Sequence, residues 1–216
     1  SIMDIKTIDG NKKELGGKLT ANTFGSKLFI EGPLSNSGNS SFIFSGKTSY
    51  LDKSSDLLYK YPILSFDEKG LPYSYTDLYA KFSSKAKSGS KISVFGFNFA
   101  DNVNYENISE LNWDSKGIGS EFILIPGGSP VLIEGNFAWS SYDISLDEQS
   151  NALRKSGIQG FNMGFDFTYF QPKGKIKYGF DIHGFSTNFS TYNSVNSLIT
   201  QDENTSEFSG YINYQS

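Results

Sequence analysis

The feature that most constrains this chain is a strict alternation of apolar with small or polar residues, sustained over unusually long segments. Within residues 157–171, every second residue over one stretch is large and apolar, so these side chains would share one side of an extended chain: Phe161, Met163, Phe165, Phe167 and Tyr169. A period of two indicates a β-strand with one apolar face. A helix would instead repeat its apolar positions every three or four residues.

The same alternation recurs along the chain and predicts an all-β protein of about ten strands. We expect them at residues 14–24, 26–33, 41–51, 72–84, 91–101, 109–124, 131–146, 157–171, 175–189 and 206–215. Several of these segments are far longer than a typical strand in a soluble protein, which has roughly five or six residues. A tilted strand needs about 9–11 residues to cross a bilayer. The lengths therefore favour an antiparallel transmembrane outer-membrane β-barrel, present here as a partial barrel.

Composition excludes several other classes of protein. The net charge of −4 argues against nucleic-acid binding, which needs a basic surface. The chain has no Cys, so it has neither a disulfide framework nor a thiolate site. No apolar run approaches the roughly 18 residues of a transmembrane helix. Aromatic residues nevertheless make up 16% of the chain, interleaved with Gly, Ser and Asn, which suits exposed strands with one apolar face.

The connections between the expected strands alternate in length. Short ones are expected at residues 34–40, 86–90, 125–130 and 172–174, and longer ones at 52–71, 102–108, 147–156 and 190–205. Outer-membrane barrels have short periplasmic turns and longer extracellular loops. We therefore expect the short connections in the periplasm and the long ones outside. The long loops would hold Asp147, Glu148, Asp202 and Glu203 as solvated charges, or as weak cation or substrate contacts.

The hairpin of residues 158–189 gives the sharpest expectation about pairing. A two-residue turn at Lys173-Gly174 would set Pro172 opposite Lys175 and bring the apolar faces of both strands to one side. We expect this apolar face to contact lipid through Phe161, Met163, Phe165, Phe167, Tyr169, Ile176, Tyr178, Phe180 and Ile182. An aromatic ladder on a soluble sheet is the alternative interpretation.

The opposite face of this hairpin is polar and rich in Gly, and we expect it to line a lumen. It carries Asp166, Asp181 and His183. In the expected register the two aspartates lie directly opposite each other, where like charges repel. A cation such as Lys177 or Lys81 is expected between them, or else both project into lumen water.

No residue pattern predicts catalysis, a cofactor or a metal, and we expect the chain not to be an enzyme. His183 is the only His and has no ligand cluster at metal spacing around it. It also has no nucleophile beside it in the sequence with which to form a catalytic triad. Gly127-Gly128 is expected in a turn, since the Lys-Ser/Thr of a phosphate loop does not follow it.

Seven short segments resemble, in order, the end of the plug domain and the first barrel strands of TonB-dependent outer-membrane receptors of the Bacteroidota type. They are Ser1-Ile2-Met3-Asp4-Ile5-Lys6 with Asp9-Gly10-Asn11, Leu28-Phe29-Ile30-Glu31-Gly32-Pro33, Phe42-Ile43-Phe44-Ser45-Gly46-Lys47-Thr48-Ser49-Tyr50-Leu51-Asp52, Asp77-Leu78-Tyr79-Ala80-Lys81, Leu111-Asn112-Trp113, Asp166-Phe167-Thr168-Tyr169 and Gly179-Phe180-Asp181. The third departs from the family pattern, in which Arg is commoner than Lys47.

The resemblance implies that residues 1–13 end a plug domain and that 14–216 begin a plugged barrel of about 22 strands. Most of the plug, the segment that TonB grips and the later strands are then expected elsewhere in a longer chain. No signal peptide is visible. The last residues, 214–216, fall within an expected strand and lack the terminal aromatic of such barrels.

As a function, the resemblance implies uptake of a scarce nutrient across the bacterial outer membrane. Its implied partners are outer-membrane lipid, the TonB energising complex, and a small-molecule, glycan or peptide ligand, with an outer-membrane lipoprotein as a further candidate. Two alternatives stay open. One is a passive porin-like or structural outer-membrane barrel, and the other is a soluble all-β binding or adhesion module.

Overall fold

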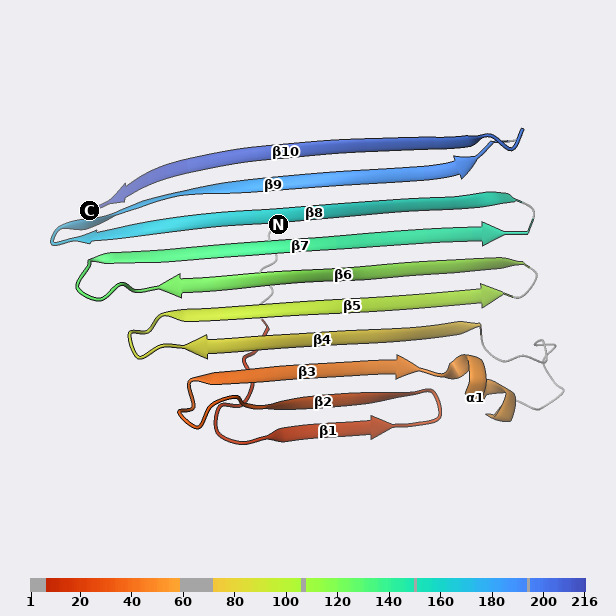
Figure 1. The fold of residues 1–216 in the computed structure, drawn as a ribbon, viewed down its shortest axis with the longest axis horizontal. Coiled ribbons are helices and arrows are strands. Elements are labelled where there is room, and N and C mark those ends of the chain that lie inside the picture. Colours follow the sequence, from red (N-terminus) through yellow and green to blue (C-terminus); the bar gives the residue numbers. More distant parts are fainter. Residues whose placement is uncertain (1–6, 59–71, 106–107, 150, 194) are drawn as a thin grey trace.

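The computed structural model describes residues 7–58, 72–105, 108–149, 151–193 and 195–216, and most of them are in strands (Figure 1). Within these residues ten strands form one antiparallel sheet, in the order of the sequence. Their bounds are β1 (Gly16–Ala21), β2 (Gly25–Pro33), β3 (Ser40–Ser49), β4 (Tyr73–Lys85), β5 (Lys91–Tyr105), β6 (Ser109–Leu124), β7 (Val131–Glu148), β8 (Asn151–Gln171), β9 (Gly174–Tyr192) and β10 (Leu198–Gln215). The expected all-β fold, with its ten antiparallel strands, is confirmed.

The sheet is an up-and-down meander with two free edges. Each strand pairs only with its neighbours in sequence, so β1 and β10 lie at opposite ends of the sheet (Figure 1). The two edges differ in length, with six residues in β1 and 18 in β10. Every residue of β10 is exposed. This is the geometry of one sector of a barrel wall.

The sheet has no second layer among the described residues, and its apolar side chains stay accessible. Ile43, 4% exposed, is the only buried apolar residue there. Large side chains such as Phe208, at 74%, and Phe137, at 42%, remain open to their surroundings. A soluble domain of this size would bury such side chains between two layers. Backbone pairing and contacts between neighbouring strands therefore hold the described sheet together.

The strands lengthen along the sheet, from six residues in β1 to 21 in β8. Most of the long connections expected at 102–108, 147–156 and 190–205 are strand, so that part of the prediction is wrong. The ladder of backbone hydrogen bonds continues through polar residues, because the pairing groups belong to the main chain. The acidic residues expected in those loops lie in β7 and β10: Asp147, Glu148, Asp202 and Glu203.

A short helix, α1 (Leu51–Leu58), follows β3 and was not expected from the sequence. The amide of Ser54 donates to the carbonyl of Tyr50 at 2.9 Å, and Asp52 lies in the first turn, where a negative charge favours the helix dipole. Eight residues are too few for a helical period to stand out in the sequence. In the described part of the chain, no helix has the length and apolar character needed to span a membrane.

The connections at the left-hand end of the sheet in Figure 1 are tight turns. Three of them contain a glycine with a positive φ: Gly38 at 68°, Gly89 at 91° and Gly128 at 77°. Any residue with a Cβ would be strained in this left-handed conformation. The turn expected at Gly127-Gly128 is thus confirmed.

The fourth turn, between β8 and β9, corrects the expected register. Gln171 pairs with Gly174, so the turn residues are Pro172 and Lys173, and Tyr169 lies opposite Ile176. The prediction was therefore wrong by two residues, although each side chain keeps its face. The reason is local, since proline favours the second position of a type I turn and glycine the fourth.

Glycines and aromatic rings alternate across neighbouring strands. The ring of Phe161 lies over Gly184, and the ring of Phe122 lies over Gly135, so that a Cβ at either glycine would collide with the ring. The glycines thus leave room for large rings to lie flat across the sheet, an arrangement that also helps to fix register.

Candidate functional site

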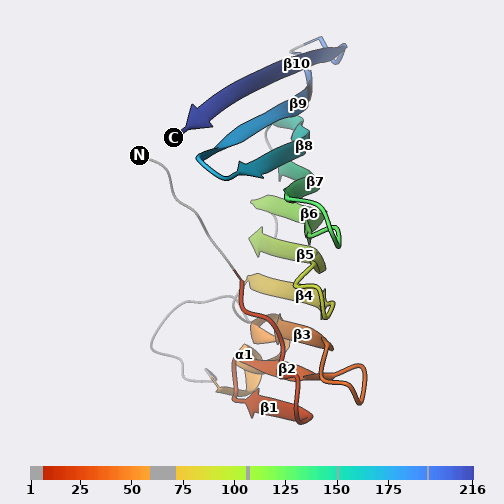
Figure 2. The ribbon, with the colours of Figure 1, turned by 90° about the vertical axis from the view of Figure 1, so that its left-hand side faces the viewer.

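The start of the described chain lies against one side of the sheet. Residues 7–11 contact β3, β4 and β5, and Figure 2 shows this segment to one side of the strands. We call this side the inner face and the other side the outer face. Directly paired residues point to the same side of a sheet. One inner row can thus be followed from Lys81 through Phe95, Gly119, Ala138 and Asn162 to His183.

The outer face of β8 and β9 carries the nine residues expected to contact lipid: Phe161, Met163, Phe165, Phe167, Tyr169, Ile176, Tyr178, Phe180 and Ile182. Rings stack between the strands, with centroids 5.3 Å apart for Phe165 and Phe180 and 5.2 Å for Phe167 and Tyr178. Neighbouring strands extend this surface with Ile133, Phe137, Trp139, Phe208 and Ile212. We call it the apolar band. Contact with lipid stays a prediction.

The apolar band has a defined height. In β8 it runs from Tyr169, beside the tight turn, to Phe161, a span of nine residues, and the next outer position is Gln159. This matches the roughly 9–11 residues with which a tilted strand crosses a bilayer. β8 then continues for ten more residues, 151–160. Tyr169 and Tyr178 lie at one margin and Trp139 at the other, where barrels carry their aromatic girdles.

The inner face of β8 and β9 is polar and carries Asp166, Asp181 and His183, as the alternation predicts. The two aspartates are not opposite each other, because Asp166 pairs with Gly179 and Asp181 pairs with Gly164. The prediction that Asp166 and Asp181 lie opposite each other and repel is therefore wrong, because the register is shifted by two residues. Whether this face lines a lumen stays a prediction.

Asp166 has its own partners. Its Oδ2 lies 3.3 Å from Nζ of Lys177, and the hydroxyl of Tyr211 donates to its Oδ1. Lys177 is one of the two lysines that we expected near the aspartates. The other, Lys81, lies elsewhere on the inner face.

His183 belongs to a network of amides on the inner face. The amide nitrogen of Asn162 lies 3.0 Å from its Nδ1, and the same amide group accepts a hydrogen bond from Asn136. Throughout the part of the chain that the structure describes, no group of three or more His, Asp or Glu residues is placed to hold a metal ion.

Lys81 is the only buried charged residue among those described, at 8% exposure. Its Nζ lies 3.1 Å from Oδ1 of Asp9 and 2.8 Å from the carbonyl oxygen of Thr7. It also lies 3.2 Å from the carbonyl oxygen of Ile8. An ammonium group has three protons to donate, and here all three find acceptors on the segment that precedes β1.

Asp9 is held from two strands. Besides Lys81, its Oδ1 accepts a hydrogen bond from the Ser83 hydroxyl at 2.9 Å, and its Oδ2 lies 3.0 Å from Nζ of Lys91 in β5. We call Asp9, Lys81, Ser83 and Lys91 the Asp9 clamp. Asp9 lies more than 70 residues before the other three members in the sequence. The alternation of strand residues gives no signal for such a long-range pairing. We did not predict it.

The two residues that follow Asp9, Gly10 and Asn11, let the chain pass close to β3 and then turn into β1. A Cβ on Gly10 would collide with the carbonyl of Phe42, so only glycine lets the segment lie this close to β3. The side chain of Asn11 then accepts hydrogen bonds from the amides of Lys13, at 2.9 Å, and Glu14, at 3.2 Å. This local turn leads the chain from the inner face into β1.

The Asp9 clamp has a predictable dependence on pH. Burial raises the pKa of Asp9, but hydrogen bonds from Lys91, Lys81 and Ser83 outweigh it, so the pKa lies well below its ordinary value of 3.8. A carboxylate with a depressed pKa stabilises the folded state above its ordinary pKa, and this contribution is lost as pH falls towards the folded value.

We therefore expect residues 7–11 to stay bound at pH 4, where an ordinary aspartate is about half neutral. Hydrogen exchange of their amides, corrected for intrinsic rates, should show equal protection at pH 7 and pH 4. In Asp9→Asn, protection should be lower and equally independent of pH. Release of the wild-type segment with a midpoint near pH 4 would contradict the role of the clamp.

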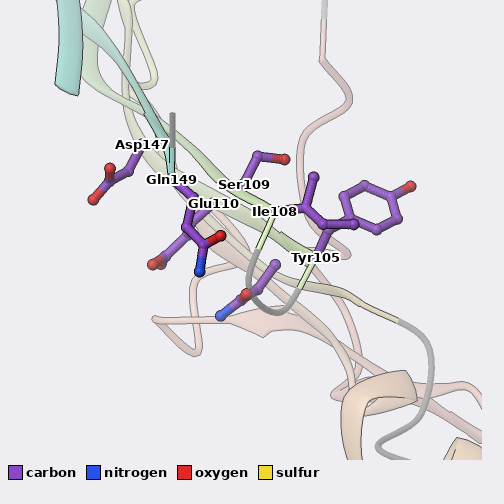
Figure 3. A pocket seen from close by; sticks show the side chains of 7 residues that line it. Tyr105, Ile108, Ser109, Glu110, Asp147 and Gln149 are labelled. Atoms are coloured by element: carbon purple, nitrogen blue, oxygen red, sulfur yellow. The ribbon is translucent and has the colours of Figure 1, made fainter. Parts of the chain in front are cut away.

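A shallow depression of about 270 Å³ lies at the far end of β5, β6 and β7 (Figure 3). Its lining consists of Asn104, Tyr105, Ile108, Ser109, Glu110, Asp147 and Gln149. Glu110 already accepts hydrogen bonds from Asn102, at 3.1 Å, and from Asn112, at 3.0 Å. Figure 3 shows the Tyr105 ring on the opposite side of the depression from the Asp147 carboxylate. It is an open gap between strand ends, and we assign it no ligand.

Strand order, face pattern and free edges are those of a sector of an antiparallel β-barrel wall. No protein-family model matches the sequence, and no curated protein matches it either. Among solved structures, the fold is similar to the hemophore receptor HasR of Serratia marcescens, determined as a double mutant in complex with its hemophore HasA and heme. The TM-score is 0.53 at 9% sequence identity, over 92% of this chain.

The chain spans 41% of the length of that receptor chain. At so low an identity, the similarity shows a common fold alone, that of an antiparallel β-barrel wall. It supports the fold expected from the family resemblance at this coarse level.

Proposed function

We propose that this chain is the plug end and first barrel sector of a TonB-dependent outer-membrane receptor of the Bacteroidota type, which takes up a scarce nutrient. In this proposal residues 1–13 belong to the plug domain and 14–216 to the barrel, and the protein is not an enzyme. Its partners are outer-membrane lipid, the TonB complex and a small-molecule, glycan or peptide ligand. An outer-membrane lipoprotein is a further candidate partner.

The observation that carries the proposal is a single-layered sheet whose outer face is apolar over the height of a bilayer. A soluble binding module would need a second layer over the apolar band, and the described residues supply none. Lipid can cover such a face without any protein partner, because it is as apolar as the side chains themselves.

The Asp9 clamp supports a plugged receptor over a passive porin. A porin keeps its lumen open to water, whereas residues 7–11 lie on the inner face and are tied to it by Lys81 and Lys91. The similarity of fold to a hemophore receptor points in the same direction.

The proposed topology can be tested with single cysteines, because the chain has none of its own. Val195, 79% exposed, lies between β9 and β10, and Lys173 lies in the turn between β8 and β9. An impermeant maleimide should label Val195→Cys on intact cells, and Lys173→Cys only after the outer membrane is permeabilised. Labelling of Lys173→Cys alone on intact cells would reverse the topology. Recovery of both proteins in the soluble fraction would favour the soluble module.

A further inference from the structure

The outer face of the sheet holds an apolar hollow to one side of the apolar band. The hollow has a volume of about 170 Å³ and lies over β3, β4 and β5. Its lining includes Phe44, Leu78, Ala80, Gly96 and Asn98, all of which occupy outer positions. Phe44 and Leu78 are 37% and 42% exposed, so the apolar walls of the hollow are accessible from outside.

A glycine leaves the floor of the hollow open. At Gly135 and Gly184, elsewhere on the outer face, a Cβ would collide with an aromatic ring from the neighbouring strand. At Gly96 a Cβ would meet only the carbonyl oxygen of Gly117, at an ordinary contact distance of 3.5 Å. In the described part of the chain, no side chain of another strand therefore fills the space above Gly96. An occupant of the hollow would come from outside the described sheet.

The polar end of the hollow lies at the depth of the apolar band, because the strands are staggered. Figure 1 shows the four tight turns stepping towards the left from β2 to β9, as the inclined strands of a barrel require. Depth is therefore measured from the end of each strand at its own tight turn. Lys116 lies eight residues before the end of β6, and Met163 of the apolar band lies eight residues before the end of β8.

Lys116 gives this end of the hollow a positive charge. It is an exposed outer residue and pairs with Asn98, which lines the hollow. Among the described residues, no carboxylate forms an ion pair with its ammonium group. A lysine on a lipid-facing surface is unfavourable unless its long stem carries the charge to the headgroup layer, where anions can meet it. The hollow thus combines apolar walls with a cation at one end.

We propose that the hollow binds an acyl chain of an anionic, phosphate-bearing lipid whose headgroup is held by Lys116 and Asn98. The proposal rests on the membrane location in the proposed function above, and it adds a preference for one class of lipid. With the tight turns in the periplasm, the Lys116 end of the hollow faces the outer leaflet, and the lipid belongs to that leaflet.

The chemistry of the two ends matches such a lipid. An ammonium group binds a phosphate oxygen as a compact point charge, and the Asn98 amide can donate to a second oxygen of the same phosphate. Asp114 lies two residues farther from the tight turn on the same face of β6 and would repel a second anionic group. The site therefore suits a headgroup with a single phosphate.

The headgroup contact is tested by native mass spectrometry of the full-length receptor, titrated in non-ionic detergent with dioleoylphosphatidylglycerol or dioleoylphosphatidylcholine. We expect the first bound lipid to be phosphatidylglycerol, with a preference of about fivefold, which is the order that one accessible ion pair supplies. Lys116→Gln should abolish this preference. Lys155→Gln is the matched control and should keep it, because Lys155 is exposed on the same face but lies in β8, beyond the apolar band.

The acyl-chain contact is tested by filling the hollow. Gly96→Leu places a side chain in the space that the structure leaves open, and it should remove the saturable first binding step for both lipids alike. Ala80→Leu fills the same hollow from β4 and serves in case Gly96→Leu does not fold. A headgroup variant therefore changes the preference between the lipids, whereas a hollow-filling variant changes the binding of both.

The other outcomes contradict the inference. An absent preference for phosphatidylglycerol, or one that survives Lys116→Gln or is lost equally in Lys155→Gln, would overturn it, because Lys116 would then have no special role. A first binding step that is unchanged in the hollow-filling variants would also overturn it, because the acyl chain would then lie elsewhere. None of these results touches the proposed function, which fails if the cysteine labelling places the protein outside the membrane.

Discussion

Replacing Phe165 with arginine should lower the free energy of unfolding of the membrane-inserted barrel by about 2–4 kcal/mol. Phe165 is the middle residue of the apolar band in β8, midway between Phe161 and Tyr169. At that depth the guanidinium group has neither water nor a carboxylate within reach, so its desolvation is not compensated. The measurement is a denaturant titration of the full-length receptor in lipid vesicles.

Gln159→Arg is the matched control, because Gln159 is exposed on the same face of the same strand, just beyond the apolar band. There we expect a cost of about 0–1 kcal/mol, as for other positions near the membrane interface. Equal costs at both positions would show that the effect does not depend on depth and would contradict the membrane assignment of the outer face.

Among changes on the inner face, replacing Lys81 with methionine should weaken the binding of residues 7–11 the most. The change keeps a long apolar stem but leaves the Thr7 and Ile8 carbonyl groups without their donor and removes one cation from Asp9. Unsatisfied buried groups of this kind cost about 1–3 kcal/mol. We expect the opening free energy of residues 7–11, measured by hydrogen exchange in the full-length receptor, to fall by that amount.

Lys91→Met removes the other cation of the Asp9 clamp and serves as the control. Lys91 has 38% of its side chain exposed against 7% for Lys81, and it donates to no carbonyl group of the segment. For such an accessible ion pair we expect an effect of about 0–1 kcal/mol. An equal or larger loss in Lys91→Met would show that charge alone, and not the buried position of Lys81, holds the segment.

The strands and their faces could be predicted because both follow from the backbone. In a strand, alternate side chains point to opposite sides, so Phe161 and Phe165 share a face whatever strand lies beside them. Register is a different matter, because a shift by two residues preserves every face. The position of Pro172 in the turn decides the register, because the preference of proline for the second turn position outweighs the turn preference of Lys173-Gly174.

Two further differences have physical reasons. Polar residues such as Asp202 and Glu203 suggested loops, but a strand in water needs no apolar face as long as its main chain is paired. The Asp9 clamp was out of reach for another reason. With 19 basic and 23 acidic residues in the chain, no charge pattern singles out Asp9 and Lys81 as partners. Only the pairing of β4 with β5 brings Lys81, Ser83 and Lys91 together.

The strictly sequential order of the strands has a consequence for how the chain folds. Each new strand closes only the loop to its predecessor, so the entropy lost at each step stays small and contact order is low. The Asp9 clamp departs from this rule, because Asp9 can bind Lys81 and Ser83 only after β4 has formed, more than 70 residues later in the sequence. Seating of residues 7–11 is therefore a late folding event, although these residues are synthesised before every strand of the described sheet.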